Sequence, residues 1–352
     1  MKRSFMSSTP SRKKDHVDLC VNEQVSFRQK TNGLEEWEFV HNALPELNTE
    51  DIDPATDFLG HRMSFPLIVT GMTGGYDQAE RINGALAEAC QDLRIGIGAG
   101  SMRQALENDT YHESYRILRR NGPDIPILAN IGAVEVAAMR DTRPAQYLVD
   151  LLEADALVVH TNPLQEFLQP EGEPRFRGVL DGLEMLVREL DVPVILKEVG
   201  AGISREAAMR AHEVGVRWID VAGAGGTSWA GVEILRRRDG CEVSPQFWDW
   251  GIPTARVLEE LRINRPPDLQ LIASGGITDG VMIAKCLALG AEIAGAARPL
   301  LTAYYDGGIA ALRNRLCGWK RDLIGVMFLT GASTIAQLKR KPIMNAKEER
   351  TA

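Results

Sequence analysis

The sequence predicts an α/β protein centred on a (β/α)8 TIM barrel, with an N-terminal arm before the barrel and a C-terminal helical tail after it. The first observation is a short apolar run that recurs about eight times between Pro66 and Ala297, ending each time in glycine or small polar residues. Buried parallel strands have this continuous apolar pattern. The second observation is an amphipathic segment of helical length between most of the runs. Repeated strand and helix indicate parallel strands joined by crossovers.

The runs and their endings define the expected strands. In order they read PLIVTGMTGG, RIGIGAGSMR, IPILANIGA, ALVVHTNPLQE, PVILKEVG, WIDVAGAGGT, LIASGGI and EIAGAARP. Helices are expected between them over 78–92, 111–121, 134–140, 177–190, 204–214, 253–263 and 280–289. Ser204 and Thr278-Asp279 are typical N-terminal caps for two of these helices. An open doubly wound sheet is the alternative, but TGMTGG does not match the GxGxxG that such a sheet carries after its first strand.

We expect one elaborated domain, because barrels of this kind often exceed ~250 residues as a single unit. Residues 1–11 are predicted to be a disordered leader, and residues 12–352 a single barrel domain. That domain includes the arm (12–62), an insertion after the sixth strand (229–250) and C-terminal helices (310–340). The insertion contains three tryptophans and is expected to cover the barrel mouth.

Composition excludes several functional classes. The net charge of −8 argues against general nucleic-acid binding. The five cysteines are dispersed without a CxxC pair, which favours free thiols in a reducing cytoplasm. The basic start is not followed by the apolar core of a signal peptide, and no stretch approaches the ~20 apolar residues of a membrane span. A soluble, cytoplasmic protein without a membrane partner is therefore expected.

The endings of the seventh and eighth runs indicate a phosphate site. Ser274 to Ile277 and Gly295 to Ala297 offer main-chain N–H groups with small side chains, at the position where barrels commonly bind phosphate. Either segment alone is explained equally well as a tight turn. Because the two follow neighbouring strands, together they favour a phosphate group held by the main chain.

Other endings suggest that this phosphate belongs to a flavin. Thr70 to Gly75, Asn130, Lys197 and Thr227 supply amide, hydroxyl and ammonium groups to one mouth. An electron-poor ring whose reduced form is anionic requires a fixed cation, which Lys197 could provide. FMN meets these conditions. The alternative for Lys197 is a salt bridge to Glu198 or another local carboxylate.

The fourth ending and the basic segments indicate a polyanionic substrate. The ending runs from His160 to Glu166. Glu166 is a hard oxygen ligand suited to Mg2+, an ion that usually keeps waters and also binds substrate phosphates. His160 alone is equally consistent with a structural, hydrogen-bonded histidine. Ser101 to Arg103 and the basic run from Arg12 to His16 would together suit a diphosphate, although a terminal basic run is equally often simply solvated.

These motifs together resemble the type 2 isopentenyl diphosphate isomerase family. The matching segments are RKxxH from Arg12 to His16, GMTGG from Gly71, GSM from Gly100, HxNxxQE from His160, KEVGxGxS from Lys197 and GGT from Gly225. The resemblance implies an isomerase of isoprenoid biosynthesis that converts isopentenyl diphosphate to dimethylallyl diphosphate, with reduced FMN as acid and base. It also implies Mg2+, reduction of the flavin by NADPH, and a homo-oligomer, either tetramer or octamer.

The resemblance assigns roles residue by residue. FMN would be held by Thr70, Gly71, Met72, Thr73, Ser101, Asn130, Lys197, Thr227, Gly275, Gly276, Ile277, Ala296 and Ala297. Substrate would be bound by Arg12, Lys13, His16, Ser101, Met102, Arg103, His160, Asn162 and Gln165. Glu166 would bind Mg2+, and Lys197, Gln165 and His160 would be catalytic. The chain departs from the family pattern at Ala222, where serine is usual, and at Arg175, which is shifted by one position.

Two classes of oxidoreductase with the same barrel fold are the alternatives to an isomerase. A hydroxy-acid oxidase would need a His/Arg pair after the sixth strand, and a nucleotide dehydrogenase a nucleophilic cysteine there; the segment from Ala222 to Gly231 contains none of these residues. A non-catalytic flavin or phosphate sensor would not require the HxNxxQE and RKxxH clusters. The sequence therefore favours the isomerase.

Overall fold

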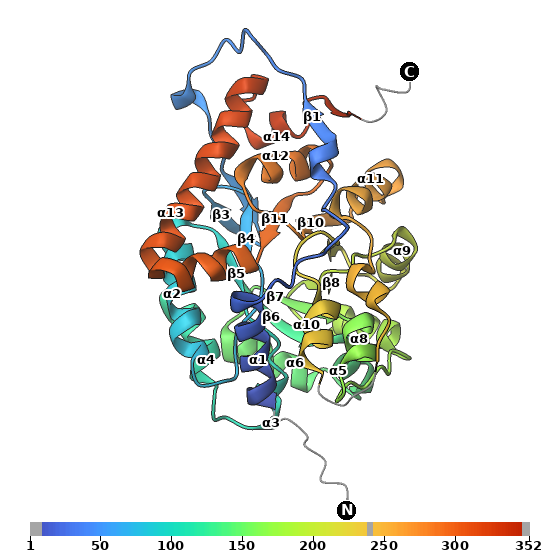
Figure 1. Cartoon of the computed structure of the whole chain (residues 1–352). Coiled ribbons are helices and arrows are strands. Elements are labelled where there is room, and N and C mark those ends of the chain that lie inside the picture. Colours follow the sequence, from blue (N-terminus) through green and yellow to red (C-terminus); the bar gives the residue numbers. More distant parts are fainter. Residues whose placement is uncertain (1–8, 238–241, 347–352) are drawn as a thin grey trace, which may run out of the picture.

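The computed structural model describes residues 9–237 and 242–346, and its centre is a closed barrel of eight parallel strands (Figure 1). The strands follow one another around the barrel in chain order, and the last pairs with the first. They are β4 (Leu67–Val69), β5 (Gly96–Gly98), β6 (Ile127–Gly132), β7 (Ala156–Thr161), β8 (Val194–Glu198), β9 (Trp218–Asp220), β10 (Gln270–Ser274) and β11 (Ile293–Ala296). The predicted fold class is confirmed.

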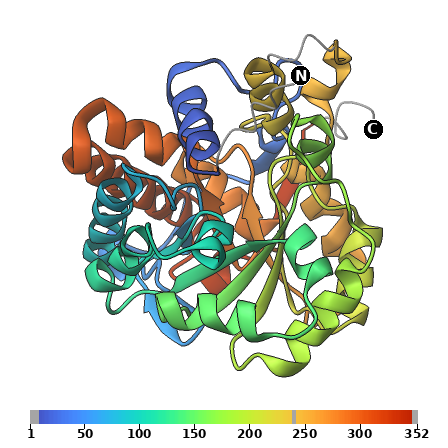
Figure 2. The same ribbon diagram turned by 90° about the horizontal axis from the view of Figure 1, so that it is seen from below.

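Helices surround the strands as an outer ring (Figure 2). The seven expected helices occur as α2 (Ala79–Leu93), α4 (Glu113–Asn121), α5 (Ala133–Ala138), α8 (Val179–Glu189), α9 (Arg205–Glu213), α11 (Thr254–Asn264) and α12 (Gly280–Ala288). Ser204 and Asp279 cap two of them by accepting the N–H groups of Ala207 and Met282. The short helices α3 (Arg103–Glu107) and α7 (Pro163–Leu168) and the longer α6 (Arg143–Leu152) were not predicted.

A hairpin closes the N-terminal end of the barrel. It consists of β2 (Thr56–Phe58) and β3 (His61–Met63), within the segment expected to be the arm. Phe58 and Met63 are buried together with residues from the lower ends of the strands. His61 Nε2 lies 3.0 Å from Asp155 Oδ1 and ties the hairpin to β7. The barrel is therefore sealed at this end, which leaves the opposite mouth for ligands.

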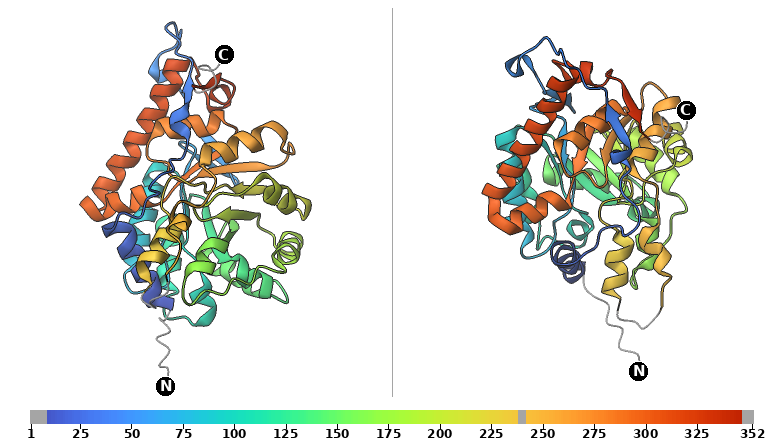
Figure 3. Two further views of the ribbon diagram at one scale, coloured as in Figure 1. Left: turned by 45° about the vertical axis from the view of Figure 1, so that its right-hand side comes forward. Right: turned by 45° about the horizontal axis from the view of Figure 1, so that its top comes forward.

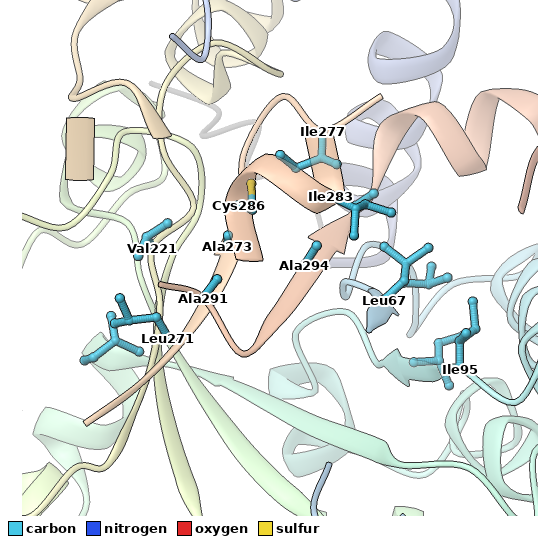
Figure 4. Packing of buried hydrophobic residues seen from close by; sticks show 14 of the residues in the cluster. Leu67, Ile95, Val221, Leu271, Ala273, Ile277, Ile283, Cys286, Ala291 and Ala294 are labelled. Carbon is cyan, nitrogen blue, oxygen red and sulfur yellow. The ribbon is translucent and has the colours of Figure 1, made fainter. Parts of the chain in front are cut away.

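The core between strands and helices fixes the loops that follow β10 and β11. Figure 4 shows Ile283 and Cys286 of α12 against Ala273 of β10 and Ala294 of β11, with Ile277 nearby. All of these side chains are buried. Burial of one large apolar side chain stabilises a fold by about 1.5–3 kcal/mol. This cluster holds the two phosphate-loop candidates in fixed relative positions.

The C-terminal tail begins earlier than the predicted residue 310. Helix α13 (Arg298–Thr330) starts directly after β11 and is interrupted at Gly307 and Gly308, where Gly308 has a φ of 66°. The interruption breaks the helical pattern, so only the second part was recognised from the sequence. Helix α14 (Ile335–Leu338) follows, and then β12 (Ile343–Asn345). No helix among the described residues, α13 included, has the length and apolar character needed to cross a membrane.

Strand pairing holds the N-terminal segment against the end of the described chain. β1 (Trp37–Phe39) pairs antiparallel with β12, so residues 37–39 lie beside residues 343–345 (Figure 3). The 3-10 helices η1 (Leu34–Glu36) and η2 (Thr49–Asp51) flank it. This pairing anchors the arm.

The start of the arm is helical. Helix α1 (Thr9–Asn22) contacts α10 (Trp229–Arg236) and α13 (Figure 1). Because α1 begins at Thr9, the last three residues of the expected disordered leader form helix, and residues 1–8 lie outside the described residues. The insertion after the sixth strand comprises α10 and η3 (Pro245–Asp249), with residues 238–241 outside the described part. Trp229 of α10 lines the cavity at the mouth, as expected for a cover.

Candidate active site

A cavity of about 350 Å3 opens at the C-terminal mouth of the barrel, bounded by strand-end loops and by α1. It brings together almost all the residues that the sequence and the family resemblance single out. Those that line it are Arg12, Lys13, His16, Thr70, Gly71, Met72, Ser101, Arg103, Asn130, His160, Asn162, Gln165, Glu166, Lys197, Thr227, Gly275, Gly276, Ile277, Ala296 and Ala297.

Two predicted residues do not line this cavity. The Thr73 side chain is buried and donates its hydroxyl hydrogen bond to Asn83 Oδ1. Met102 is fully buried, and its main-chain N–H donates to Asn130 O at 2.7 Å. Both hold the loops after β4 and β5 in shape, so their expected direct contacts with FMN and substrate have no support in this arrangement.

The loop after β10 is built for close approach of an anion to the main chain. Gly275 and Gly276 have φ values of 106° and 75°, a region that favours glycine. A Cβ atom on Gly275 would lie 2.1 Å from Gly223 O. Within the described part of the chain, the N–H groups of Gly275, Gly276 and Ala297 donate to no acceptor. These free donors, next to the start of α13, fit the phosphate of FMN.

Asn32 supports this loop and was not singled out by the sequence analysis. Its Nδ2 donates to Gly276 O at 2.7 Å, and its Oδ1 accepts the N–H of Leu34. Only 3% of Asn32 is exposed. No motif marks it, because Gly276, the residue that it supports, lies 244 residues away in the chain.

Lys197 lies at the end of β8, and its ammonium group donates to Glu198 O at 2.5 Å. The alternative of a salt bridge to the Glu198 carboxylate is not found, because Glu198 Oε2 instead accepts the N–H groups of Val199 and Gly200 at 2.6 Å. No carboxylate lies within 4.0 Å of Lys197 in the described residues. Burial raises the pKa of neighbouring Asp220, and the charge of Lys197 opposes that rise. The Lys197 ammonium group therefore has no carboxylate partner among the described residues and lines the cavity where a ligand can contact it.

His160 is neutral at physiological pH. Burial, followed by the nearby positive charge of Lys197, lowers its pKa to about 4. Its Nδ1 lies 2.8 Å from Asn130 Oδ1, and a neutral ring donates its proton there. The opposite ring nitrogen is then an acceptor. His160 thus contributes no permanent charge to the site before a phosphate arrives.

A buried hydrogen-bond network joins the fourth ending to the arm through Glu233. Asn162 Nδ2 donates to Gln165 Oε1 at 3.1 Å and to Glu166 Oε1 at 3.2 Å. Gln165 Nε2 donates to Glu233 Oε1 at 2.8 Å, and the same oxygen lies 2.9 Å from His16 Nε2. The network fixes the orientation of the Gln165 amide, since both its polar atoms are engaged.

Glu233 is the main site residue that sequence reasoning missed. It is fully buried on α10. Burial alone would raise its pKa, but hydrogen bonds and charges from His16, Arg236 and Gln165 hold that pKa at about 2. The available signal was a carboxylate inside a short apolar stretch of α10, where the four consecutive residues 230–233 are all buried. Buried charges of this kind are rare unless paired.

The basic residues around the arm are held in different ways. Lys13 donates to Gly74 O and Ser101 O at 2.7 Å and to Tyr115 Oη at 3.0 Å. Burial, and then the charge of Arg12, lower the pKa of Lys13 to about 7. An ammonium group has three donors, so Lys13 is fully engaged with protein and anchors α1 to two strand-end loops.

Arg103 is paired with two carboxylates at the edge of the cavity. Its Nη1 lies 3.1 Å from Glu135 Oε1, and its Nε lies 3.5 Å from Glu107 Oε1. Burial raises the pKa of Glu135, and the charge of Arg103 opposes that rise. The pair is partly exposed, so the guanidinium can turn toward a more strongly charged anion at little cost.

Glu166 is the metal candidate. Its Oε2 accepts the N–H of Glu173 at 2.9 Å, while Oε1 accepts from Asn162. Among the described residues no three His, Cys, Asp or Glu side chains gather closely enough to form a complete metal site. A single carboxylate nevertheless fits Mg2+, which keeps several waters and completes its shell with substrate phosphates.

This arrangement defines a barrel with donors suited to a phosphorylated cofactor at the ends of β10 and β11, and with basic residues of the arm facing the same cavity. The family model described as FMN-dependent dehydrogenase matches residues 6–114 and 128–345. The isopentenyl-diphosphate delta-isomerase of Chlorobaculum parvum is 47% identical over 97% of this chain and 99% of its own length. That of Nostoc sp. is 43% identical over 96% of both chains. The chain therefore belongs to the isopentenyl-diphosphate delta-isomerase family of FMN-dependent, type 2 proteins.

Solved structures with the same fold are more distant. A flavocytochrome b2 double mutant with pyruvate bound superposes with a TM-score of 0.68 over 96% of this chain and 83% of that chain, at 18% identity. A mandelate oxidase mutant with a monooxide FMN adduct gives 0.65 over 93% and 95%, at 19% identity. At this identity the likeness concerns the fold alone, and it confirms the predicted barrel.

Proposed function

We propose that the protein binds FMN and Mg2+ at the barrel mouth and converts isopentenyl diphosphate to dimethylallyl diphosphate. The observation that carries the proposal is the meeting of three groups of residues in one cavity: the phosphate loop, Lys197 and the network from Glu166 to His16. A sensor needs only the first two. The full-length relatives named as isopentenyl-diphosphate delta-isomerases support the same activity.

FMN would lie across the mouth, with its phosphate on the N–H groups of Gly275, Gly276 and Ala297. When bound and reduced, the flavin supplies the acid and base that the allylic proton shift requires. The ammonium group of Lys197 stabilises negative charge on the bound ring. Thr70, Asn130 and Thr227 provide the polar groups that orient it.

The diphosphate would lie between the arm and the fourth ending. Arg12 and Arg103 line the cavity and can form charge-assisted hydrogen bonds to phosphate oxygens. Mg2+ on Glu166 would bridge to the same group. His160 lies close to these charges, and its acceptor nitrogen becomes a donor if the diphosphate raises its pKa. The reacting carbons would then extend toward Lys197 and the flavin.

The side chains around the reacting end position the reacting groups without supplying the proton. Protonation of an unactivated alkene creates positive charge on a tertiary carbon. Gln165 cannot supply the proton, because a neutral amide is far too weak an acid, and one of its two N–H groups already donates to Glu233. Glu233 is ionised, since its pKa is about 2. Its carboxylate lies outside the cavity lining and is engaged with His16, Gln165 and Arg236, so it holds the Gln165 amide and the arm in position.

The remaining expectations belong to the same proposal. NADPH is the proposed reductant of the flavin, the protein is proposed to act in isoprenoid biosynthesis in the cytoplasm, and a homo-oligomer, tetramer or octamer, is its proposed assembly. Light scattering of the purified protein tests the assembly. A monomer at micromolar concentration would contradict it.

The experiment that tests the activity uses FMN-loaded protein under anaerobic conditions. NADPH, Mg2+ and isopentenyl diphosphate are added, and dimethylallyl diphosphate is followed by proton NMR. Formation of the allylic isomer is expected. Its absence with protein whose flavin is spectroscopically reduced would contradict the proposed function.

A further inference from the structure

Arg298 stands at the junction between the proposed phosphate loop and the N-terminal arm. It is the first residue of α13, directly after Ala297, and it lines the same cavity as Gly275 and Gly276. It belongs to the eighth strand ending, but no motif of the sequence marks it.

The guanidinium of Arg298 holds the arm where α1 ends. Nε donates to Cys20 O at 2.7 Å, and Nη2 donates to Glu23 O at 3.0 Å. Nη1 donates to Ser26 Oγ at 2.8 Å. The last carbonyl groups of a helix lack donors within the helix, and a cation there also faces the negative end of the helix dipole. Arg298 is therefore the C-terminal cap of α1.

The contacts beyond Ser26 continue across the mouth. Ser26 pairs with Thr227 as an isolated antiparallel bridge, and its carbonyl accepts the indole N–H of Trp248 at 2.9 Å. Phe27 N donates to Gly226 O at 3.1 Å. One arginine thus links α1, the loop after β9 and the insertion.

The electrostatic free energy of the Arg298 guanidinium at this position depends on whether an anion lies nearby. The N-terminus of α13 presents unsatisfied N–H groups and the positive end of a helix dipole, so a second positive charge there is unfavourable. A phosphate on the N–H groups of Gly275, Gly276 and Ala297 would offset both. The arm would then close at lower cost when that phosphate is present.

We propose that Arg298 couples binding of the cofactor phosphate to closure of the substrate-binding arm. The coupling rests on the proposed function, since it takes the phosphate to be that of FMN. Helix α1 carries Arg12 and His16, so closure assembles the diphosphate site. Because coupling between two binding events is reciprocal, the closed arm also tightens FMN binding. The substrate site is therefore complete only in FMN-loaded protein.

Hydrogen exchange followed by mass spectrometry tests the coupling on full-length apoprotein, alone and with saturating riboflavin or FMN. FMN is expected to slow exchange in α1 by about tenfold, and riboflavin, which lacks the phosphate, by less than about twofold. Arg298→Gln is expected to bind FMN about tenfold more weakly and to lose the slowing even at saturation. Arg313→Gln, on the same helix but paired with Glu88 on the outer surface, is the matched control and is expected to behave as the unmodified protein.

Flavin fluorescence titration separates the two proposals. Wild-type protein that binds no FMN would overturn both the function and the coupling. Three results would overturn the coupling alone. The first is FMN binding that leaves exchange in α1 unchanged, and the second is equal slowing of exchange by riboflavin. The third is slowing by FMN that persists in Arg298→Gln. If Arg298→Gln does not fold, Ser26→Ala removes one of its acceptors; a loss of about twofold to threefold in FMN-dependent slowing is expected, and no loss would overturn the coupling.

Discussion

Glu233 offers the sharpest quantitative test of the site geometry, through Glu233→Gln. The surroundings of this carboxylate lower its pKa from 4.5 to about 2. At about 1.4 kcal/mol for each pKa unit, this shift corresponds to roughly 3 kcal/mol in favour of the ionised form. Glutamine keeps the size of the side chain but leaves His16 and Arg236 without their charged partner, and breaking one half of a buried pair costs about 3–5 kcal/mol. We therefore expect the free energy of unfolding at pH 7 to fall by about 3 kcal/mol.

The pH dependence of this loss follows from the direction of the shift. Because the folded-state pKa lies below the unfolded value, the stabilisation is fully present above pH 4.5 and is lost as the pH falls toward about 2. Urea unfolding followed by tryptophan fluorescence, at pH 7 and at pH 3 to 4, measures the difference between the two proteins. Glu38→Gln, on the exposed position of β1, is the control and is expected to change stability by less than about 0.5 kcal/mol. An unchanged stability at pH 7, or a difference that grows as the pH falls, would refute the reasoning.

Further predictions concern the cofactor loop, the metal and the histidine. Gly276→Ala is expected to weaken FMN binding by at least about tenfold while leaving riboflavin binding nearly unchanged, because a Cβ there would lie 2.9 Å from Gly225 O at a φ of 75°. Fluorescence titration measures both affinities, and equal losses for the two flavins would contradict a phosphate role for this loop. Glu166→Gln is expected to raise the Mg2+ concentration for half-maximal activity by about tenfold or more without altering FMN affinity; an unchanged metal dependence would remove Glu166 from the metal site. The imidazole of His160 is expected to stay neutral in NMR titrations down to about pH 5, since its pKa is about 4. Between pH 6.5 and 4 the unfolded chain binds a proton that the folded chain does not, so the free energy of unfolding decreases as the pH falls through that range. A His160 signal that titrates near pH 6.5 in the ligand-free protein would contradict its burial beside Lys197.

The eight strands were predictable because a strand buried on both faces has a continuous apolar sequence, and their endings then located the mouth. The caps at Ser204 and Asp279 were predictable because a helix cap depends only on residues close to it in the chain. The start of α13 was placed too late, because Gly307 and Gly308 interrupt its pattern.

Residues whose role depends on distant partners could not be found in this way. Glu233 acquires its importance from His16 and Gln165, which lie 217 and 68 residues away. Asn32 and Arg298 likewise act on segments remote in the chain. In the opposite direction, Thr73 belongs to a matching motif, yet its side chain turns away from the cavity. A motif identifies a loop, whereas packing decides which of its side chains reach the ligand.

The central claim is that this site performs an isomerisation with a reduced flavin and no net oxidation. The most direct measurement counts dimethylallyl diphosphate formed for each NADPH oxidised by FMN-loaded protein in the absence of oxygen. Many molecules of product for each NADPH are predicted, because the flavin needs only one reduction to support repeated turnover. One product for each NADPH, or NADPH consumption without the allylic isomer, would contradict the claim and indicate an oxidoreductase.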